Sequence, residues 1–106
     1  MGRVYVIETV FSKNGVPIRL TDERWAHITE EHCELAGQRV EVLGGLEDPD
    51  RILAGNEGEQ MAVKEISAGV NLVVVYRELE NDGFIITAFI TSKAKWLNRR
   101  EQIWPK

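Results

Sequence analysis

The chain has 106 residues, of which 43% are hydrophobic and 28% are charged, and its formal net charge is −4. This length is typical of one domain, so we expect a single domain over residues 1–106. There is no apolar run long enough to span a bilayer, and the first residues lack the apolar stretch of a signal peptide. Cys33 is the only cysteine, which excludes an internal disulfide and favours a reducing compartment. We therefore expect a cytoplasmic protein with no membrane partner.

The charge is distributed unevenly along the chain. Residues 1–91 carry 8 Lys/Arg against 16 Asp/Glu, whereas residues 92–106 carry 5 against 1. The acidic bulk argues against indiscriminate binding of nucleic acid, which depends on neutralising phosphates with Lys and Arg. The basic segment at the end, with Lys93 and Lys95, could still meet a phosphate, although most such runs are only solvated surface.

The chain opens with a strand and a turn. Residues 3–10 alternate polar and apolar side chains, which predicts a short strand. Residues 14–17 have the composition of a turn in which Gly15 adopts a positive φ.

Two helices are expected next. Thr21 is suited to cap the first, which should run to about His32 with Trp25 on its buried side. The second is expected over residues 38–46, before Asp-Pro-Asp at residues 48–50 stops it. Its buried face is predicted to consist of Val40, Leu43 and Leu46.

From residue 51 the pattern changes to strands. Four β-rich segments separated by short Gly-, Asn- and Ser-containing turns are found at residues 51–54, 61–66, 72–77 and 84–91. Short connections force antiparallel neighbours. The sequence therefore predicts an α+β fold, with two N-terminal helices packed on one face of a three- to four-stranded antiparallel sheet. The last two strands are the most apolar and should be central.

Two histidines are candidates for chemistry. His27 and His32 are five positions apart, roughly 140° around a helix, so we expect them on different faces. His27 lies among glutamates at helical spacing, where a plain surface histidine is as good an interpretation as a functional one. His32 lies on the apolar side, where a half-buried structural histidine is the commoner outcome. The adjacent Cys33 has no CxxC partner, so we expect no metal site. No nucleotide-cofactor motif is present either, and no cofactor is expected.

The last two strands offer a candidate phosphate site. Thr87 and Thr91 lie on the same face of their strand, and Arg77 ends the preceding strand. A cation beside two hydroxyls could bind a phosphate, although threonines in a strand are usually there because β-branched residues favour strands.

The register of this hairpin decides whether the site can form. A two-residue loop at residues 82–83 would pair Glu78 with Thr87 and turn Arg77 to the other face. A three-residue loop at residues 81–83, with its glycine in the left-handed region, would pair Arg77 directly with Thr87. We favour the second, because it leaves one wholly apolar face for the helices.

A resemblance to a known group of proteins covers roughly residues 16–95. Residues 18–28 through 32–35, which contain the string Leu-Thr-x-x-Arg-Trp-x-His-Ile, resemble the opening helix of the phage-associated nuclease-like families grouped with barnase, EndoU, colicin and RelE. Residues 48–52, 73–76 and 83–89 are similar to later segments of that group. Cys33 stands where those families commonly have a proline after the second histidine.

The resemblance implies a domain that cleaves RNA without a metal. A histidine would take the proton of a ribose 2′-hydroxyl, which then attacks the adjacent phosphate. Arg77 or a lysine would stabilise the phosphoryl charge, and Thr87 or Thr91 would position the phosphate. Two other readings stay open. The acidic bulk suits a non-catalytic module that binds a basic protein, and a toxin component held in check by an inhibitory partner protein is a third.

Overall fold

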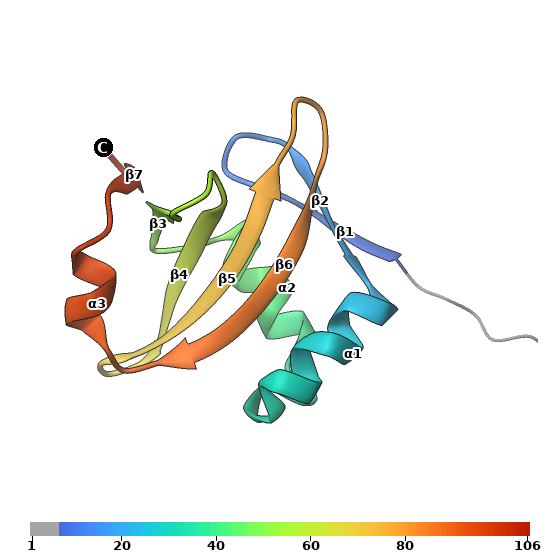
Figure 1. Cartoon of the computed structure of the whole chain (residues 1–106), viewed down its shortest axis with the longest axis horizontal. Coiled ribbons are helices and arrows are strands. Elements are labelled where there is room, and N and C mark those ends of the chain that lie inside the picture. Colours follow the sequence, from blue (N-terminus) through green and yellow to red (C-terminus); the bar gives the residue numbers. More distant parts are fainter. Residues whose placement is uncertain (1–6) are drawn as a thin grey trace, which may run out of the picture.

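The computed structural model describes residues 7–106 and is built on a mixed β-sheet (Figure 1). Its strand order is β1-β2-β6-β5-β4-β3-β7. The strands are β1 Ile7–Phe11, β2 Pro17–Thr21, β3 Arg51–Ala54, β4 Gln60–Ser67, β5 Val70–Glu78, β6 Gly83–Thr91 and β7 Gln102–Trp104. The α-helices are α1 Asp22–Glu31, α2 Arg39–Glu47 and α3 Ala94–Asn98. Adjacent strands are antiparallel, except for the parallel pair β2 and β6.

The predicted architecture of two helices on a three- to four-stranded antiparallel sheet is wrong. Within the described residues the sheet has seven strands, is mixed, and is accompanied by three helices. The four segments expected after residue 51 are present as β3 to β6 and form an antiparallel meander. Sequence analysis missed β2, α3 and β7. Each is no longer than five residues, so none carries enough periodicity to be recognised before its partners are known.

The start of the chain agrees in part with expectation. The expected strand at residues 3–10 is represented by β1, and residues 3–6 of that prediction lie outside the described residues. Gly15 has the predicted positive φ, of 77°, in the turn between β1 and β2. Among residues 7–106, no helix is both long and apolar enough to cross a membrane.

Helices α1 and α2 cover one face of the sheet, and α3 lies on the other (Figure 1). Tyr76 of β5 is fully buried beneath α1 and α2. The core on that face also contains Ile18, Leu20, Ile28, Leu35, Val42, Leu43, Leu46, Ala62, Leu72, Val74, Ile85 and Ala88. On the opposite face Leu97 of α3 packs on Leu53, Met61, Val63 and Val73. The sheet is therefore covered on both sides, but only in part on the α3 side.

The buried face of α2 differs from the prediction. Val40 is 75% exposed, whereas Val42, Leu43 and Leu46 are buried. The helix is rotated so that Gly45 also faces the sheet, where an added Cβ would lie 3.1 Å from a methyl carbon of Leu72. The glycine inside this helix is explained by that close approach to β5.

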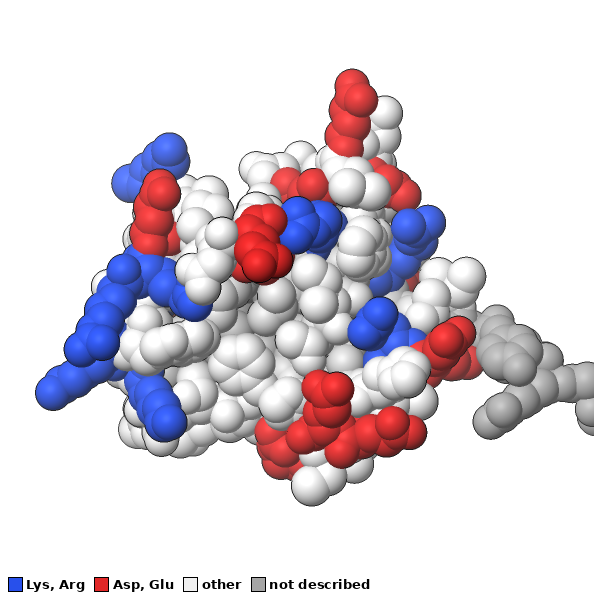
Figure 2. Space-filling view, in the orientation of Figure 1, with Lys and Arg blue, Asp and Glu red and all other residues white. Residues whose placement is uncertain are grey.

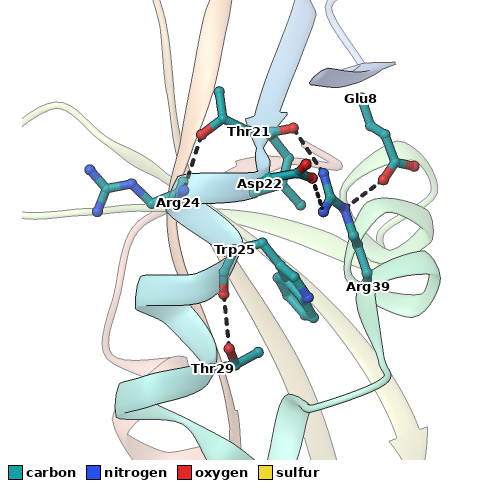
Figure 3. A network of polar contacts seen from close by, with 8 residues as sticks. Glu8, Thr21, Asp22, Arg24, Trp25, Thr29 and Arg39 are labelled. Carbon is teal, nitrogen blue, oxygen red and sulfur yellow. Dashed lines mark hydrogen bonds and ion pairs between the residues drawn. The ribbon is translucent and has the colours of Figure 1, made fainter. Parts of the chain in front are cut away.

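A polar network fixes the start of α1 (Figure 3). The side chain of Thr21 accepts a hydrogen bond of 3.1 Å from the backbone N–H of Arg24, which confirms the predicted cap. Arg39, at the beginning of α2, donates to Asp22 at 2.7 Å and to the carbonyl of Leu20 at 3.3 Å, and forms an ion pair with Glu8 of β1. One guanidinium thus ties two strands and two helices together, and it sets the position of the first turn of α1.

The register of the β5–β6 hairpin follows neither predicted loop. Glu78 pairs with Gly83, and a bulge at Ile86 shifts the register so that Thr87 pairs with Val75. Gly83 is not in the left-handed region. It lies between β5 and β2, where a Cβ would come within 2.3 Å of the carbonyl oxygen of Arg77. Close packing against the unpredicted β2, rather than turn geometry, explains this glycine.

Candidate functional site

A pocket of about 270 Å³ lies between α1 and the edge of β6 that β2 leaves free. Among the sequence-predicted site residues, His27, His32 and Thr87 line it together. The complete lining is Arg24, His27, Ile28, Glu31, His32, Ile86 and Thr87. The structure therefore gathers two histidines, an arginine and a threonine around one opening.

Both histidines line the pocket, His27 from within α1 and His32 from the end of this helix. α1 stops at Glu31, and His32 is its C-cap residue, with φ −129° and ψ 71°. Its backbone N–H still donates to the carbonyl of Ile28, at 2.8 Å. The expected separation of about 140° around the helix does not keep the two histidines apart, because they lie at the two edges of one arc of α1 that lines the pocket.

Each imidazole has a carboxylate near its Nδ1 atom. Nδ1 of His32 lies 3.5 Å from Glu34, and Nδ1 of His27 lies 4.0 Å from Glu30. The side chain of His27 is 59% exposed and that of His32 is 31% exposed. A carboxylate on one ring nitrogen orients an imidazole and leaves Nε2 for a proton transfer. Both rings are thus partly held and still accessible.

Arg24 is the cation of this pocket, and sequence analysis missed it. Arg24, His27 and Glu31 are spaced three and four residues apart, which places them on one face of α1 beside Ile28. Figure 3 shows the side chain of Arg24 directed away from Arg39 and its partners Glu8 and Asp22, so Arg24 does not pair with those carboxylates. A polar stripe at helical spacing was the signal that could have identified it.

Thr87 contributes a buried hydroxyl. Its Oγ1 atom is shielded from solvent and has no hydrogen-bond partner among the described residues. An unpaired buried hydroxyl costs about 1–3 kcal/mol of stability. The bulge at Ile86 places Ile86 and Thr87 together on the wall of the pocket.

Arg77 does not take part in this pocket. It lies on the same face of the sheet as Thr87 but pairs with Phe84, so the predicted direct pair of Arg77 and Thr87 is wrong. Its guanidinium donates to the carbonyl of Glu57 at 3.0 Å and lies 3.6 Å from Glu59. The backbone N–H of Glu57, assisted by Arg77, holds the pKa of the Glu59 carboxyl below its usual value. Arg77 therefore braces the β3–β4 loop.

The remaining predicted residues lie at the other end of β6. Thr91 pairs with Asn71, and its hydroxyl accepts a hydrogen bond of 3.1 Å from the backbone N–H of Lys93. Lys93 and Lys95 line a second hollow of about 500 Å³ along α3, together with Trp96. Thr91 thus supports the entry to α3, and the lysines belong to a separate surface.

Within residues 7–106 there is no cluster of His, Cys, Asp or Glu with the arrangement of a metal site. Comparison of the chain with protein-family models, with curated proteins and with solved structures found no match.

Proposed function

We propose that this chain is a metal-independent RNA-cleaving domain whose reaction takes place in the α1–β6 pocket. The observation that carries the proposal is the meeting of His27, His32, Arg24 and Thr87 around one opening of about 270 Å³. These are the groups that transfer of a phosphoryl group to a neighbouring hydroxyl requires: a base, an acid, a cation and a hydroxyl. Two of these residues, Arg24 and His27, belong to the string at residues 20–28 that resembles the phage-associated nuclease-like families.

In the proposed reaction one histidine, with Nε2 unprotonated, accepts the proton of a ribose 2′-hydroxyl. The 2′-oxygen attacks the adjacent phosphorus, and the bond from phosphorus to the 5′-oxygen of the next nucleotide breaks. The other histidine, protonated, gives its proton to that leaving oxygen. The products are a 2′,3′-cyclic phosphate and a free 5′-hydroxyl, and the two histidines have exchanged protonation states.

Arg24 and Thr87 would act on the phosphoryl oxygens. Negative charge grows on these oxygens as the 2′-oxygen attacks, and a guanidinium at the pocket wall stabilises it. Thr87 supplies a hydroxyl whose hydrogen-bonding capacity is unused by the described residues. This assignment replaces Arg77 with Arg24 as the cation, because Arg77 is already engaged by Glu57 and Glu59.

The test is cleavage of single-stranded RNA in the presence of EDTA. We expect the wild-type protein to cleave, and His27→Gln, His32→Gln and Arg24→Gln each to lower the rate by roughly 100-fold or more. Arg19→Gln is the matched control, because Arg19 is an exposed β2 cation that forms an ion pair with Asp82 outside the pocket. Cleavage that is lost in EDTA, or that survives all three pocket substitutions, would refute the proposal.

The alternative of a non-catalytic protein-binding module has one structural observation in its favour. Strand β1 lies at the edge of the sheet and exposes Ile7 by 62% and Phe11 by 58%. An edge strand with apolar side chains can pair with a strand of another chain. Wild-type protein that is inert toward RNA but is captured by a partner through β1 would favour this reading.

A further inference from the structure

The segment after β6 carries cations that the proposed cleavage reaction does not use. In Figure 2, Lys and Arg side chains gather along the left edge of the face, where Figure 1 places α3. Lys93, Lys95 and Arg99 are exposed there. None of the ion pairs within residues 7–106 involves these three side chains. Their charge is available to a partner.

An aromatic ring stands among these cations. Trp96 is 39% exposed and borders two adjoining hollows of about 500 and 430 Å³. The guanidinium carbon of Arg100 lies 4.8 Å from the centre of its indole ring. Arg100 itself donates to the carbonyl of Ala54 at 3.3 Å and to the side chain of Asn56 at 3.1 Å. The indole is therefore supported by an anchored cation while part of its surface stays open.

Phe89 connects this ring to the histidine pocket. Its ring centre lies 6.0 Å from that of His32 and 6.1 Å from that of Trp96. Both separations fall within the range of aromatic contacts. A chain of rings thus runs across the open part of the sheet from the pocket to α3.

The charges at the two ends of this chain of rings are opposite. The end of α1 and the turn after it expose Glu30, Glu31 and Glu34. Figure 2 shows Asp and Glu side chains at the lower edge of the molecule, where Figure 1 places the end of α1. A polyanion that reaches the histidines is repelled beyond α1 and attracted toward α3. A polyanion bound at the histidines is therefore expected to extend toward α3.

We propose that Phe89, Trp96 and the α3 cations form a binding track for single-stranded RNA on one side of the scissile phosphate. A base stacks on Trp96, and the adjoining phosphates meet Lys93, Lys95 and Arg99. Aromatic platforms beside a basic groove bind single strands in this way, because bases in a duplex do not offer their faces. The placement of the track beside the scissile phosphate rests on the proposed function, whereas the stacking and charge contacts do not.

The experiment measures binding separately from cleavage. The probe is a short single-stranded 2′-O-methyl RNA, which lacks the attacking hydroxyl and cannot be cleaved by the proposed route. We expect Trp96→Leu to weaken its binding about 10-fold, the order of one lost base stack, and Trp96→Phe to retain most of it. The double substitution Lys95→Gln with Arg99→Gln should weaken binding and lower the slope of log K against log salt by roughly 1.4. Lys64→Gln, on β4 beside Asp48 and Asp50, removes a surface cation outside the track and is the control, which should change neither the affinity nor the salt slope.

Two results would overturn the track. One is equal binding of the probe by the wild-type protein and Trp96→Leu. The other is equal affinity for the single strand, a duplex of the same sequence and polyglutamate, which would indicate a site for acidic polymers in general. A wild-type protein that binds the probe through Trp96 but does not cleave RNA would support the track and refute the proposed function. The two proposals can therefore fail independently.

Discussion

Nδ1 of His32 lies 3.5 Å from a carboxylate oxygen of Glu34, just beyond the end of α1. His32 is the residue at which the helix stops, so its ring is not positioned by helical geometry. Two contacts position it instead: the carboxylate of Glu34 and the ring of Phe89, whose centre lies 6.0 Å from that of His32. The placement of one proposed catalytic group therefore depends on contacts made outside the helix, of which Glu34 is the charged one.

This contact gives the first prediction. Glu34→Gln should leave the fold intact, because Glu34 is exposed, but it should lower the rate of RNA cleavage. We expect a smaller loss than the roughly 100-fold caused by removing an acid or base, with the change in kcat rather than KM. Glu41→Gln, at an exposed position on α2, is the control. A purely KM effect of Glu34→Gln would show that Glu34 does not position the ring.

The second prediction concerns the unpaired hydroxyl of Thr87. Thr87→Val replaces a buried hydroxyl that has no partner among the described residues, so the free energy of unfolding should be unchanged or should rise by up to about 1 kcal/mol. The cleavage rate should fall. Thr91→Val is the matched variant, because the Thr91 hydroxyl accepts a hydrogen bond from Lys93, and we expect it to lose about 1 kcal/mol. Urea unfolding of both variants measures the difference. A destabilised Thr87→Val would show that the hydroxyl is already satisfied.

The third prediction uses two glycines. A methyl group at Gly83 would come within 2.3 Å of the carbonyl oxygen of Arg77 and within 2.6 Å of Ile18, so Gly83→Ala should destabilise the fold by about 3 kcal/mol or more. Gly44, inside α2, has no atom within 4 Å of an added Cβ. Gly44→Ala should therefore stabilise by up to about 1 kcal/mol. Thermal midpoints that move in the same direction for both variants would contradict the packing of β6 on β2.

The fourth prediction is a pH dependence of stability. The pKa of Glu59 is lowered in the folded state, first by the Glu57 backbone N–H, so the folded protein favours the carboxylate. The resulting stability is present above the unfolded pKa and is lost as the pH falls through the folded pKa. Glu59→Gln should therefore flatten the loss of stability in acid. Identical acid unfolding curves for the variant and the wild type would show that the Glu59 carboxylate does not contribute to the pH dependence of stability.

The strands of the meander and the first two helices could be predicted from the sequence because their signals are local. The segments of β3 to β6 are rich in residues that favour strands and have turn residues between them, and Thr21 is a typical N-cap for α1. Strand β2 could not be recognised, since its last residue is the helix cap Thr21 and its pairing with β6 is parallel and distant in sequence. Because of this extra strand, a glycine is needed at position 83 to fit between β5 and β2, and not to form the turn as predicted.

The candidate site was predictable in its residue types and only partly in its geometry. His27, His32 and Thr87 were identified and do line one pocket, but the arc of α1 that brings both histidines to it was not recognised. The pairing of Glu78 with Gly83 puts Phe84 rather than Thr87 opposite Arg77, and the Arg77 side chain contacts the β3–β4 loop. Arg24 was visible in the sequence as part of a polar stripe with His27 and was overlooked.

The most direct test of the central claim is the pH dependence of kcat/KM for RNA cleavage in EDTA. A mechanism with one neutral and one protonated histidine predicts a bell-shaped profile, with the acidic limb reporting the base and the alkaline limb reporting the acid. We expect His27→Gln and His32→Gln each to lower the rate and to remove one limb, a different limb for each variant. A profile that keeps both limbs in both variants, or cleavage that requires a divalent cation, would contradict the assignment of the reaction to these two histidines.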